Sequence, residues 1–119
     1  MGEIDTRMVM PEALVQALAD VKKQFMSRLV PSILEIEALQ SELRDPLKAP
    51  AALERLSFIV HKLHGLAMTV GFAELGRCAA DLDLRLRAIL SELENSALQV
   101  GLAEALEDLM DQMEDAVLA

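Results

Sequence analysis

Residues 53–71 read LERLSFIVHKLHGLAMTVG, and the apolar side chains in this run recur at alternating spacings of three and four. This is the period of one face of an α-helix, and a regular alternation of this kind is typical of helices packed in a bundle. The apolar stripe consists of Leu53, Leu56, Val60, Leu63, Ala67 and Val70. Gly71 follows directly and is the residue type that most readily adopts a left-handed helix cap. The sequence therefore predicts a core-facing helix from about Pro50 to Val70.

The same spacing continues toward the C-terminus. A second stripe consists of Phe72, Leu75, Ala79, Leu82, Leu86, Ile89 and Leu93. Ser96 with Gln99 three positions later has the pattern of a capping box, so we expect a last helix to open there. The apolar positions of that helix are Leu98, Leu102, Ala105, Leu109, Met113 and Ala116.

Toward the N-terminus, helical spacing begins after Pro11 and runs to a loop marked by Asp45-Pro46 and Ala49-Pro50. Pro31 interrupts this stretch and lacks a backbone donor, so we expect two segments with a break between about Ser27 and Pro31. The predicted fold is all-α, an up-down four-helix bundle with an additional N-terminal helix or extension.

Length and charge limit the classes of function. A chain of 119 residues fits a single domain, 1–119, in which we expect residues 1–10 to be a flexible N-terminus. The net charge of −9 argues against nucleic acid as a partner. The single cysteine, Cys78, excludes an internal disulfide and fits a reducing compartment. No apolar run is long enough to span a bilayer, so we expect a cytoplasmic protein without membrane contact.

The predicted helix over Pro50–Val70 carries an unusual outward face. At about 100° per residue, His61 lies about 140° from the centre of the stripe and faces water. Phe58, His61, Gly65 and Met68 share this face, with Lys62 and His64 at its two edges. Glycine inside a helix costs about 1 kcal/mol relative to alanine, and such departures gather at functional sites. The face is either a place where another molecule approaches His61 or an ordinary surface with scattered apolar residues.

The run from Val60 to Leu75, in which Leu63, Gly65, Ala67 and Gly71 follow His61, resembles the histidine-containing phosphotransfer (HPt) family. The resemblance implies that His61 is the phosphoacceptor. His64 stands where the family usually has the lysine or arginine that helps neutralise the phosphate, and Lys62 is a further candidate for that role. Gly65 matches the glycine that clears space for a receiver domain. Phe58 and Met68 are expected to supply apolar docking contacts.

The resemblance also implies a function. The chain would accept a phosphoryl group on His61 from a receiver-domain aspartate or a histidine kinase, and pass it to another receiver domain. The partners would be response-regulator receiver domains and a hybrid histidine kinase. The sequence has neither a glycine-rich phosphate loop nor a kinase signature. We therefore expect a phosphocarrier without kinase activity of its own, leaving its status as an enzyme open. We expect no cofactor on this chain, with Mg²⁺ held by the receiver.

The residues also allow two alternatives. His61 and His64 are spaced like metal ligands, but Phe58 stands three positions before His61, where a bundle metal site would have a glutamate. We therefore expect no metal site. The second alternative is a non-catalytic helical adaptor or dimerisation bundle. Such a protein would bury Phe58 in a permanent interface, whereas a carrier needs a clear surface beside His61.

Overall fold

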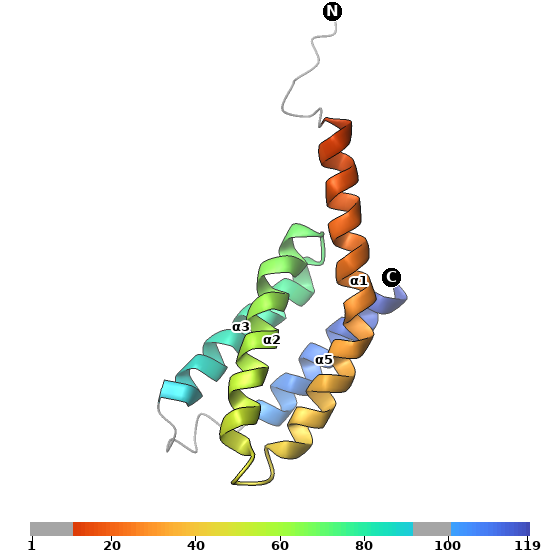
Figure 1. Cartoon of the computed structure of the whole chain (residues 1–119). Coiled ribbons are helices and arrows are strands. Elements are labelled where there is room, and N and C mark those ends of the chain that lie inside the picture. The colour runs from red at the N-terminus through yellow and green to blue at the C-terminus, as the bar shows by residue number, and fades with distance from the viewer. Residues whose placement is uncertain (1–10, 92–100) are drawn as a thin grey trace, which may run out of the picture.

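The structure is a computed structural model that describes residues 11–91 and 101–119, and Figure 1 shows its architecture. The described residues form four helices and no strands, which confirms the all-α bundle. The helices are α1 (Glu12–Glu42), α2 (Ala49–Thr69), α3 (Ala73–Ser91) and α5 (Leu102–Leu118). Successive helices run in alternating directions, as the predicted up-down topology requires. None of the helices in these two ranges is long and apolar enough to cross a membrane.

The first helix is continuous through Pro31, so the predicted break between Ser27 and Pro31 is wrong. A proline removes one backbone hydrogen bond from a helix. Here the apolar stripe on both sides of it is buried, because Leu29 and Ile33 pack into the core. Packing of one face contributes more to the stability of a helix than the propensity of a single residue. Burial of the apolar stripe therefore keeps α1 helical on both sides of Pro31.

The predicted N-terminal addition is the first part of α1 and not a separate helix. At about 1.5 Å per residue, the 31 residues of α1 span about 46 Å, against about 32 Å for the 21 residues of α2. Figure 1 shows α1 projecting beyond the other helices at its N-terminal end. Its first buried side chain is Phe25, which stacks on Phe72 with ring centroids 5.8 Å apart. The bundle proper therefore begins near Phe25.

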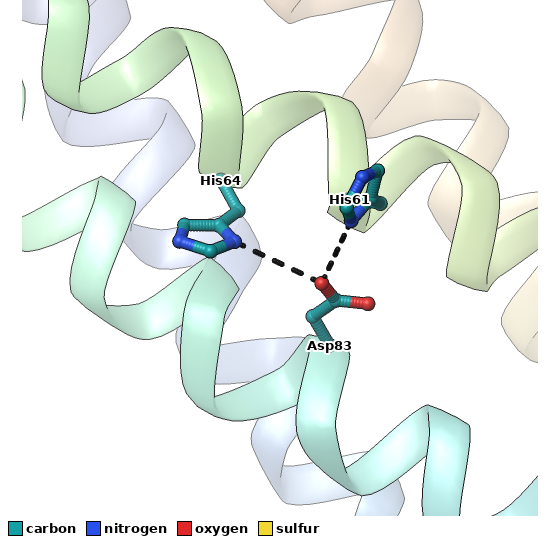
Figure 2. A group of neighbouring side chains, drawn as sticks. All are labelled: His61, His64 and Asp83. Atoms are coloured by element: carbon teal, nitrogen blue, oxygen red, sulfur yellow. Dashed lines mark hydrogen bonds and ion pairs between the residues drawn. The ribbon is translucent and has the colours of Figure 1, made fainter.

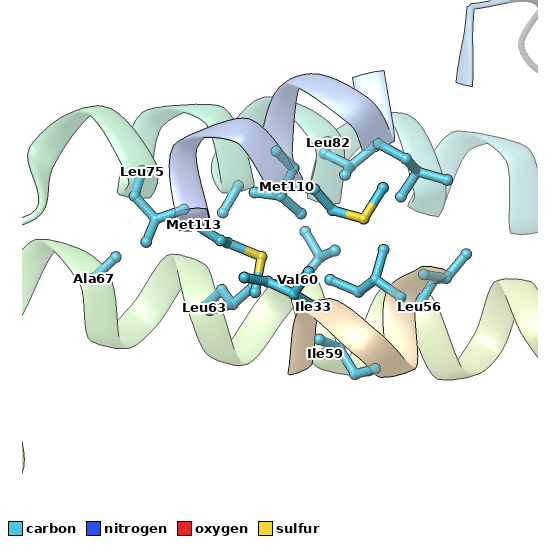
Figure 3. Packing of buried hydrophobic residues seen from close by; sticks show 14 of the residues in the cluster. Ile33, Leu56, Ile59, Val60, Leu63, Ala67, Leu75, Leu82, Met110 and Met113 are labelled. Atoms are coloured by element: carbon cyan, nitrogen blue, oxygen red, sulfur yellow. The ribbon is translucent and has the colours of Figure 1, made fainter. Parts of the chain in front are cut away.

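The six predicted stripe residues, five on α2 and Val70 at its C-cap, are all buried, and Figure 3 shows several of them against α3, α5 and α1. The turn from α2 to α3 closes at Gly71, whose φ is +93°. There the Phe72 amide donates to the Ala67 carbonyl at 2.8 Å, and the Gly71 amide donates to the Met68 carbonyl at 3.3 Å. These two bonds form a Schellman motif, which confirms the predicted left-handed cap. The turn fixes α3 against α2.

The last described helix is α5. Gly101, with a φ of +84°, is the N-cap of α5, and Leu102 is its first residue. The predicted capping box of Ser96 and Gln99 lies outside the described residues, as do Leu93, Leu98 and the predicted flexible N-terminus. The core positions predicted within α5 are confirmed as buried for Leu102, Leu109, Met113 and Ala116, while Ala105 is half-buried.

Candidate functional site

His61 lies in the middle of α2 on the side turned away from the core. Its neighbours Val60 and Leu63 are buried, and a helix that buries those positions must turn position 61 toward solvent. The His61 side chain is 60% exposed. The predicted exposure of this imidazole is confirmed, and its ring is accessible to a second protein.

The other residues predicted for the outward face are also exposed. Phe58 and Met68 are 54% and 57% exposed, and Gly65 has open space where a Cβ would stand. The Met68 side chain lies against Gly76 of α3. If Gly76 had a Cβ atom, that atom would stand only 2.6 Å from the Met68 sulfur. The missing side chain of Gly76 thus lets Met68 lie across the neighbouring helix. Their assignment as docking residues stays a prediction.

Lys62 lies away from the imidazoles. Its ammonium group is 5.4 Å from the centroid of the Phe58 ring, and the Arg55 guanidinium lies 5.3 Å from the same centroid. Both distances suit cation–π contacts. Lys62 also lines a groove between α1 and α2, on the opposite side of the face from α3. The structure therefore places Lys62 beside Phe58, and a different cation stands beside His61.

Asp83 of α3 is the residue that sequence reasoning missed. Its side chain is 6% exposed, and it is the one buried charged residue in the described part of the chain. Its Oδ2 atom lies 3.0 Å from Nδ1 of His61 and 3.8 Å from Nδ1 of His64, so both imidazoles point to one carboxylate oxygen (Figure 2). The first distance is that of a hydrogen bond, and the second is too long for one.

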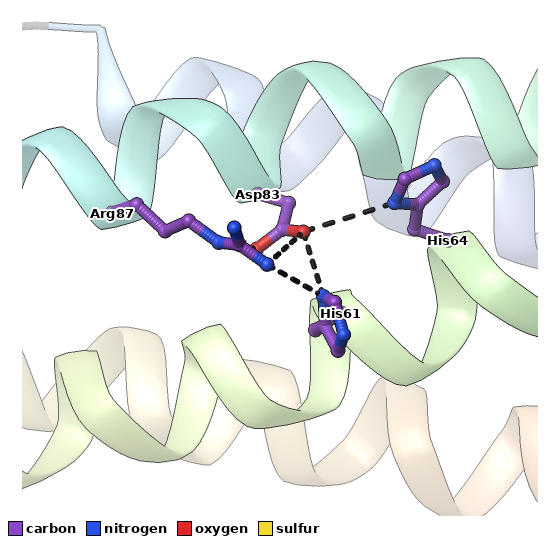
Figure 4. Close-up of polar contacts among 4 residues, drawn as sticks. All are labelled: His61, His64, Asp83 and Arg87. Carbon is purple, nitrogen blue, oxygen red and sulfur yellow. Dashed lines mark hydrogen bonds and ion pairs between the residues drawn. The ribbon is translucent and has the colours of Figure 1, made fainter.

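Arg87 is the cation beside His61, and sequence reasoning missed it as well. It stands one helical turn after Asp83 on α3, and its Nε donates to Oδ1 of Asp83 at 3.2 Å. Its Nη2 lies 3.4 Å from Oδ2 of Asp83 and 2.9 Å from Nδ1 of His61 (Figure 4). A signal was present in the sequence, because an aspartate and an arginine four residues apart commonly pair on a helix. That signal does not say that the pair faces α2.

The two contacts of His61 Nδ1 require opposite tautomers. Donation to Asp83 needs a proton on Nδ1, whereas acceptance from Arg87 needs a lone pair there. We favour donation to Asp83, because a nitrogen lone pair facing a carboxylate oxygen at 3.0 Å would be repelled by it. The Arg87 side chain is 58% exposed and can turn aside, whereas Asp83 is held in place. In this tautomer the outer nitrogen of His61, Nε2, carries the lone pair.

The charge state of Asp83 follows from the same contacts. Burial alone would raise the pKa of this carboxyl group, because it disfavours the charged form. The hydrogen bond with His61 and the positive charge of Arg87 outweigh that effect, so the pKa of Asp83 lies below its ordinary value. Asp83 is therefore a carboxylate at neutral pH. It can accept a hydrogen bond from a protonated ring nitrogen or form an ion pair with a cation.

No carboxylate on α2 stands where a bundle metal site would have one, but the neighbouring helix supplies a carboxylate. Asp83 supplies it from α3, and one ligand atom from each of His61, His64 and Asp83 lies within 4.8 Å of the others. The donor set of two imidazoles and one carboxylate is one that transition metals accept. One reason for expecting no metal site is therefore removed, while the predicted outward position of His61 stands.

Comparison with known proteins gives one match. A family model described as "Hpt domain" matches residues 13–116, which cover most of the chain and include the whole of α2 and α3. Neither the curated proteins nor the solved structures include a match to this sequence.

Proposed function

The chain belongs to the Hpt domain family, whose members carry out phosphotransfer in two-component phosphorelays, and on this premise we propose that it is a phosphorelay intermediate. It accepts a phosphoryl group on His61 from a receiver-domain aspartate, or from a histidine kinase, and passes it to another receiver domain. It acts in the cytoplasm as a phosphocarrier without kinase activity of its own. The observation that carries the proposal is the exposed His61 imidazole whose inner nitrogen is held by a buried carboxylate.

The hydrogen bond to Asp83 has a chemical consequence. With the proton of Nδ1 directed to Asp83, the lone pair of Nε2 points into solvent and can act as a nucleophile. As an N–P bond forms, the ring gains positive charge, and the Asp83 carboxylate 3.0 Å from Nδ1 stabilises it. Asp83 thus orients the ring and favours the reactive tautomer.

The transfer step balances without further reagents. The Nε2 lone pair of His61 forms a bond to phosphorus, the bond between phosphorus and the aspartyl oxygen breaks, and the receiver's carboxylate leaves with that electron pair. Transfer to a second receiver is the reverse reaction. Phosphoryl transfer depends mainly on positioning and charge neutralisation. We propose that Mg²⁺ on the receiver supplies part of the neutralising charge, and that this chain needs no cofactor of its own.

Cations near His61 would supply the rest of that charge. Arg87 is the nearest, with its Nη2 2.9 Å from the ring, and its exposed side chain can follow a phosphoryl group on Nε2. His64 lies beside the same carboxylate and can contribute when protonated. Lys62 is further round the helix, beside Phe58, and would act on a docked receiver more than on the phosphoryl group.

Receiver docking would use the exposed face around His61. Gly65 stands one turn after His61 and leaves open space there, so a receiver could bring its aspartate close to the ring. Phe58 and Met68 offer apolar surface on either side. We propose that these three residues contact the receiver.

The experiment that tests the proposal is a transfer assay. The protein is incubated with a panel of phosphorylated receiver domains and Mg²⁺, and acid-labile, alkali-stable label is measured on it. We expect label on the wild type and on Glu54→Gln, an exposed position of the same helix, and none on His61→Gln. Circular dichroism would establish that all three proteins remain folded.

Two results would count against the proposal. Label retained on His61→Gln would overturn the assignment of the site. No label from any receiver, nor from a histidine kinase with ATP added in a second assay, with the fold intact, would favour the adaptor or dimerisation bundle.

A further inference from the structure

Three side chains of types that can ligate a metal, from two helices, converge on one point beside α2. His61 and His64 both direct Nδ1 toward Oδ2 of Asp83, at 3.0 Å and 3.8 Å. Figure 2 shows the two rings on either side of the carboxylate. This is the one group of three or more such residues found close enough together among the described residues. Because the donors come from α2 and α3, the packing of the two helices fixes their approach.

The spacing of the donors is close to what a tetrahedral ion requires. Zinc binds imidazole nitrogen and carboxylate oxygen at about 2.0–2.2 Å, so its ligand atoms stand about 3.4 Å apart. The separations of 3.0 Å and 3.8 Å from Oδ2 fall on either side of that value, and all three atoms lie within 4.8 Å of one another. The His61 and His64 side chains are 60% and 44% exposed and have room to rotate, whereas the carboxylate is buried. Small side-chain rotations would therefore bring the three atoms to bonding distance.

The site already attracts a cation. The Nη2 of Arg87 lies 2.9 Å from His61 Nδ1 and 3.4 Å from Asp83 Oδ2, so it stands directly beside two of the three donors (Figure 4). Because the arginine side chain is 58% exposed, it can turn into solvent and leave this position to an ion, which would then face the Asp83 carboxylate in its place. A metal ion and Arg87 would thus compete for the same place.

We propose that His61, His64 and Asp83 form a binding site for a transition-metal ion of the zinc class, with a fourth position open to water. Imidazole ligands favour Zn²⁺, Ni²⁺ and Cu²⁺, whereas Mg²⁺ prefers oxygen ligands and retains its own water. The site therefore discriminates against the Mg²⁺ on which a receiver depends.

Metal binding would have a consequence for His61 that rests on the proposed function. The ion takes the lone pair of Nδ1, and the ring proton then resides on Nε2, which loses its nucleophilic lone pair. The proton only moves between ring nitrogens, so no oxidant or other reagent is needed. The metal-loaded chain is therefore unable to accept a phosphoryl group until the ion leaves.

Direct binding tests the site independently of phosphotransfer. Zn²⁺ is titrated into the full chain in competition with a chromogenic chelator, with millimolar Mg²⁺ present throughout. We expect one ion per chain, with affinity reduced at least tenfold in each of His61→Gln, His64→Gln and Asp83→Asn. Arg87→Ala should bind several-fold more tightly, because the competing cation is gone. Arg77→Ala, which removes an exposed arginine paired with Glu74 on the same helix, is the matched control and should bind like the wild type.

The outcomes separate the two proposals. Unchanged affinity in His64→Gln and Asp83→Asn would overturn the site, as would several weakly bound ions per chain. Loss of label on adding Zn²⁺, reversed by a chelator, is the result expected for the regulatory consequence. Binding with the predicted variant pattern but undiminished label would overturn that consequence. If no receiver ever labels the chain, the proposed function fails while the binding pattern still decides the metal site.

Discussion

At the scale of single residues, the chemistry of His61 depends on a carboxylate that stands 22 positions later in the sequence. An exposed imidazole alone would exchange its proton between the two ring nitrogens. Asp83 removes that freedom, because it is buried, ionised and 3.0 Å from Nδ1. One aspartate on α3 thus favours the tautomer in which Nε2 of His61 carries the lone pair, as the proposed phosphotransfer requires.

We predict that Asp83→Asn lowers the rate of phosphoryl transfer to His61 at least about tenfold, because a neutral amide neither stabilises the positive ring nor selects the tautomer. The measurement is the single-turnover rate of labelling from one phosphorylated receiver, at saturating receiver so that docking is not limiting. An unchanged rate would mean that the contact with Asp83 has no part in the reaction.

Asp83 should also make stability depend on pH. Its pKa in the folded state is lowered, so folding favours the ionised form. That stabilisation is present above the unfolded pKa, near about 3.9, and is lost as the pH falls through the lower folded value. We expect wild type to exceed Asp83→Asn in unfolding free energy at pH 7, and the difference to shrink below about pH 4. Denaturant titrations of both proteins from pH 7 to pH 2.5 would test this, and a difference independent of pH would contradict it.

Gly65 is expected to lower the stability of the protein and, in return, to leave the surface beside His61 open to a partner. Because a Cβ at this position would meet open space beyond its own stretch of helix, Gly65→Ala should raise the unfolding free energy by up to about 1 kcal/mol through helix propensity alone. Gly65→Leu should fold equally well, since leucine is also a good helix former.

The transfer rate should fall from glycine to alanine to leucine, because each larger side chain obstructs the approach of the receiver to His61. Thermal melts and labelling rates of the three proteins give both trends. Equal rates for all three would mean that no partner approaches over Gly65.

At the scale of helices, the sequence predicts packing better than it predicts interruptions. The α2 stripe and the Gly71 cap are predicted correctly, because both depend on local spacing and on one glycine. The break at Pro31 is predicted wrongly, because local rules do not include the burial of Leu29 and Ile33 on either side of it. Asp83 and Arg87 are missed for a related reason, since their place opposite His61 depends on how α3 lies against α2. No spacing within one helix reveals that register.

We predict that Pro31→Ala stabilises the protein, by up to about 3 kcal/mol, because it restores a backbone donor and removes the ring from the helix interior. Urea unfolding of the two proteins would measure the difference. Pro31 also lines the groove between α1 and α2, and a less stable Pro31→Ala would mean that its ring contributes more by packing there than it costs in α1.

At the scale of the whole molecule, the site and the projecting end of α1 are separate parts. His61 and Asp83 are held by the packing of α2 on α3, whereas the side chains of α1 before Leu18 are all exposed. Leu14 and Val15 are each 46% exposed, which leaves apolar surface without a partner within the described chain. A transfer domain needs only the bundle, while an adaptor or dimerisation bundle would use this end of α1 as well.

Removal of residues 1–17 should therefore leave both the bundle and the transfer reaction intact. All the core residues of α1 lie at or after Phe25, so we expect the melting temperature to fall by less than about 4 °C, which corresponds to less than about 1 kcal/mol for a domain of this size. Labelling of His61 should proceed at the wild-type rate. Thermal melts, light scattering and the transfer assay test this together. A large loss of stability, accompanied by conversion of a dimer to a monomer, would instead mean that Leu14 and Val15 are buried between two chains, and that the projecting helix is an interface.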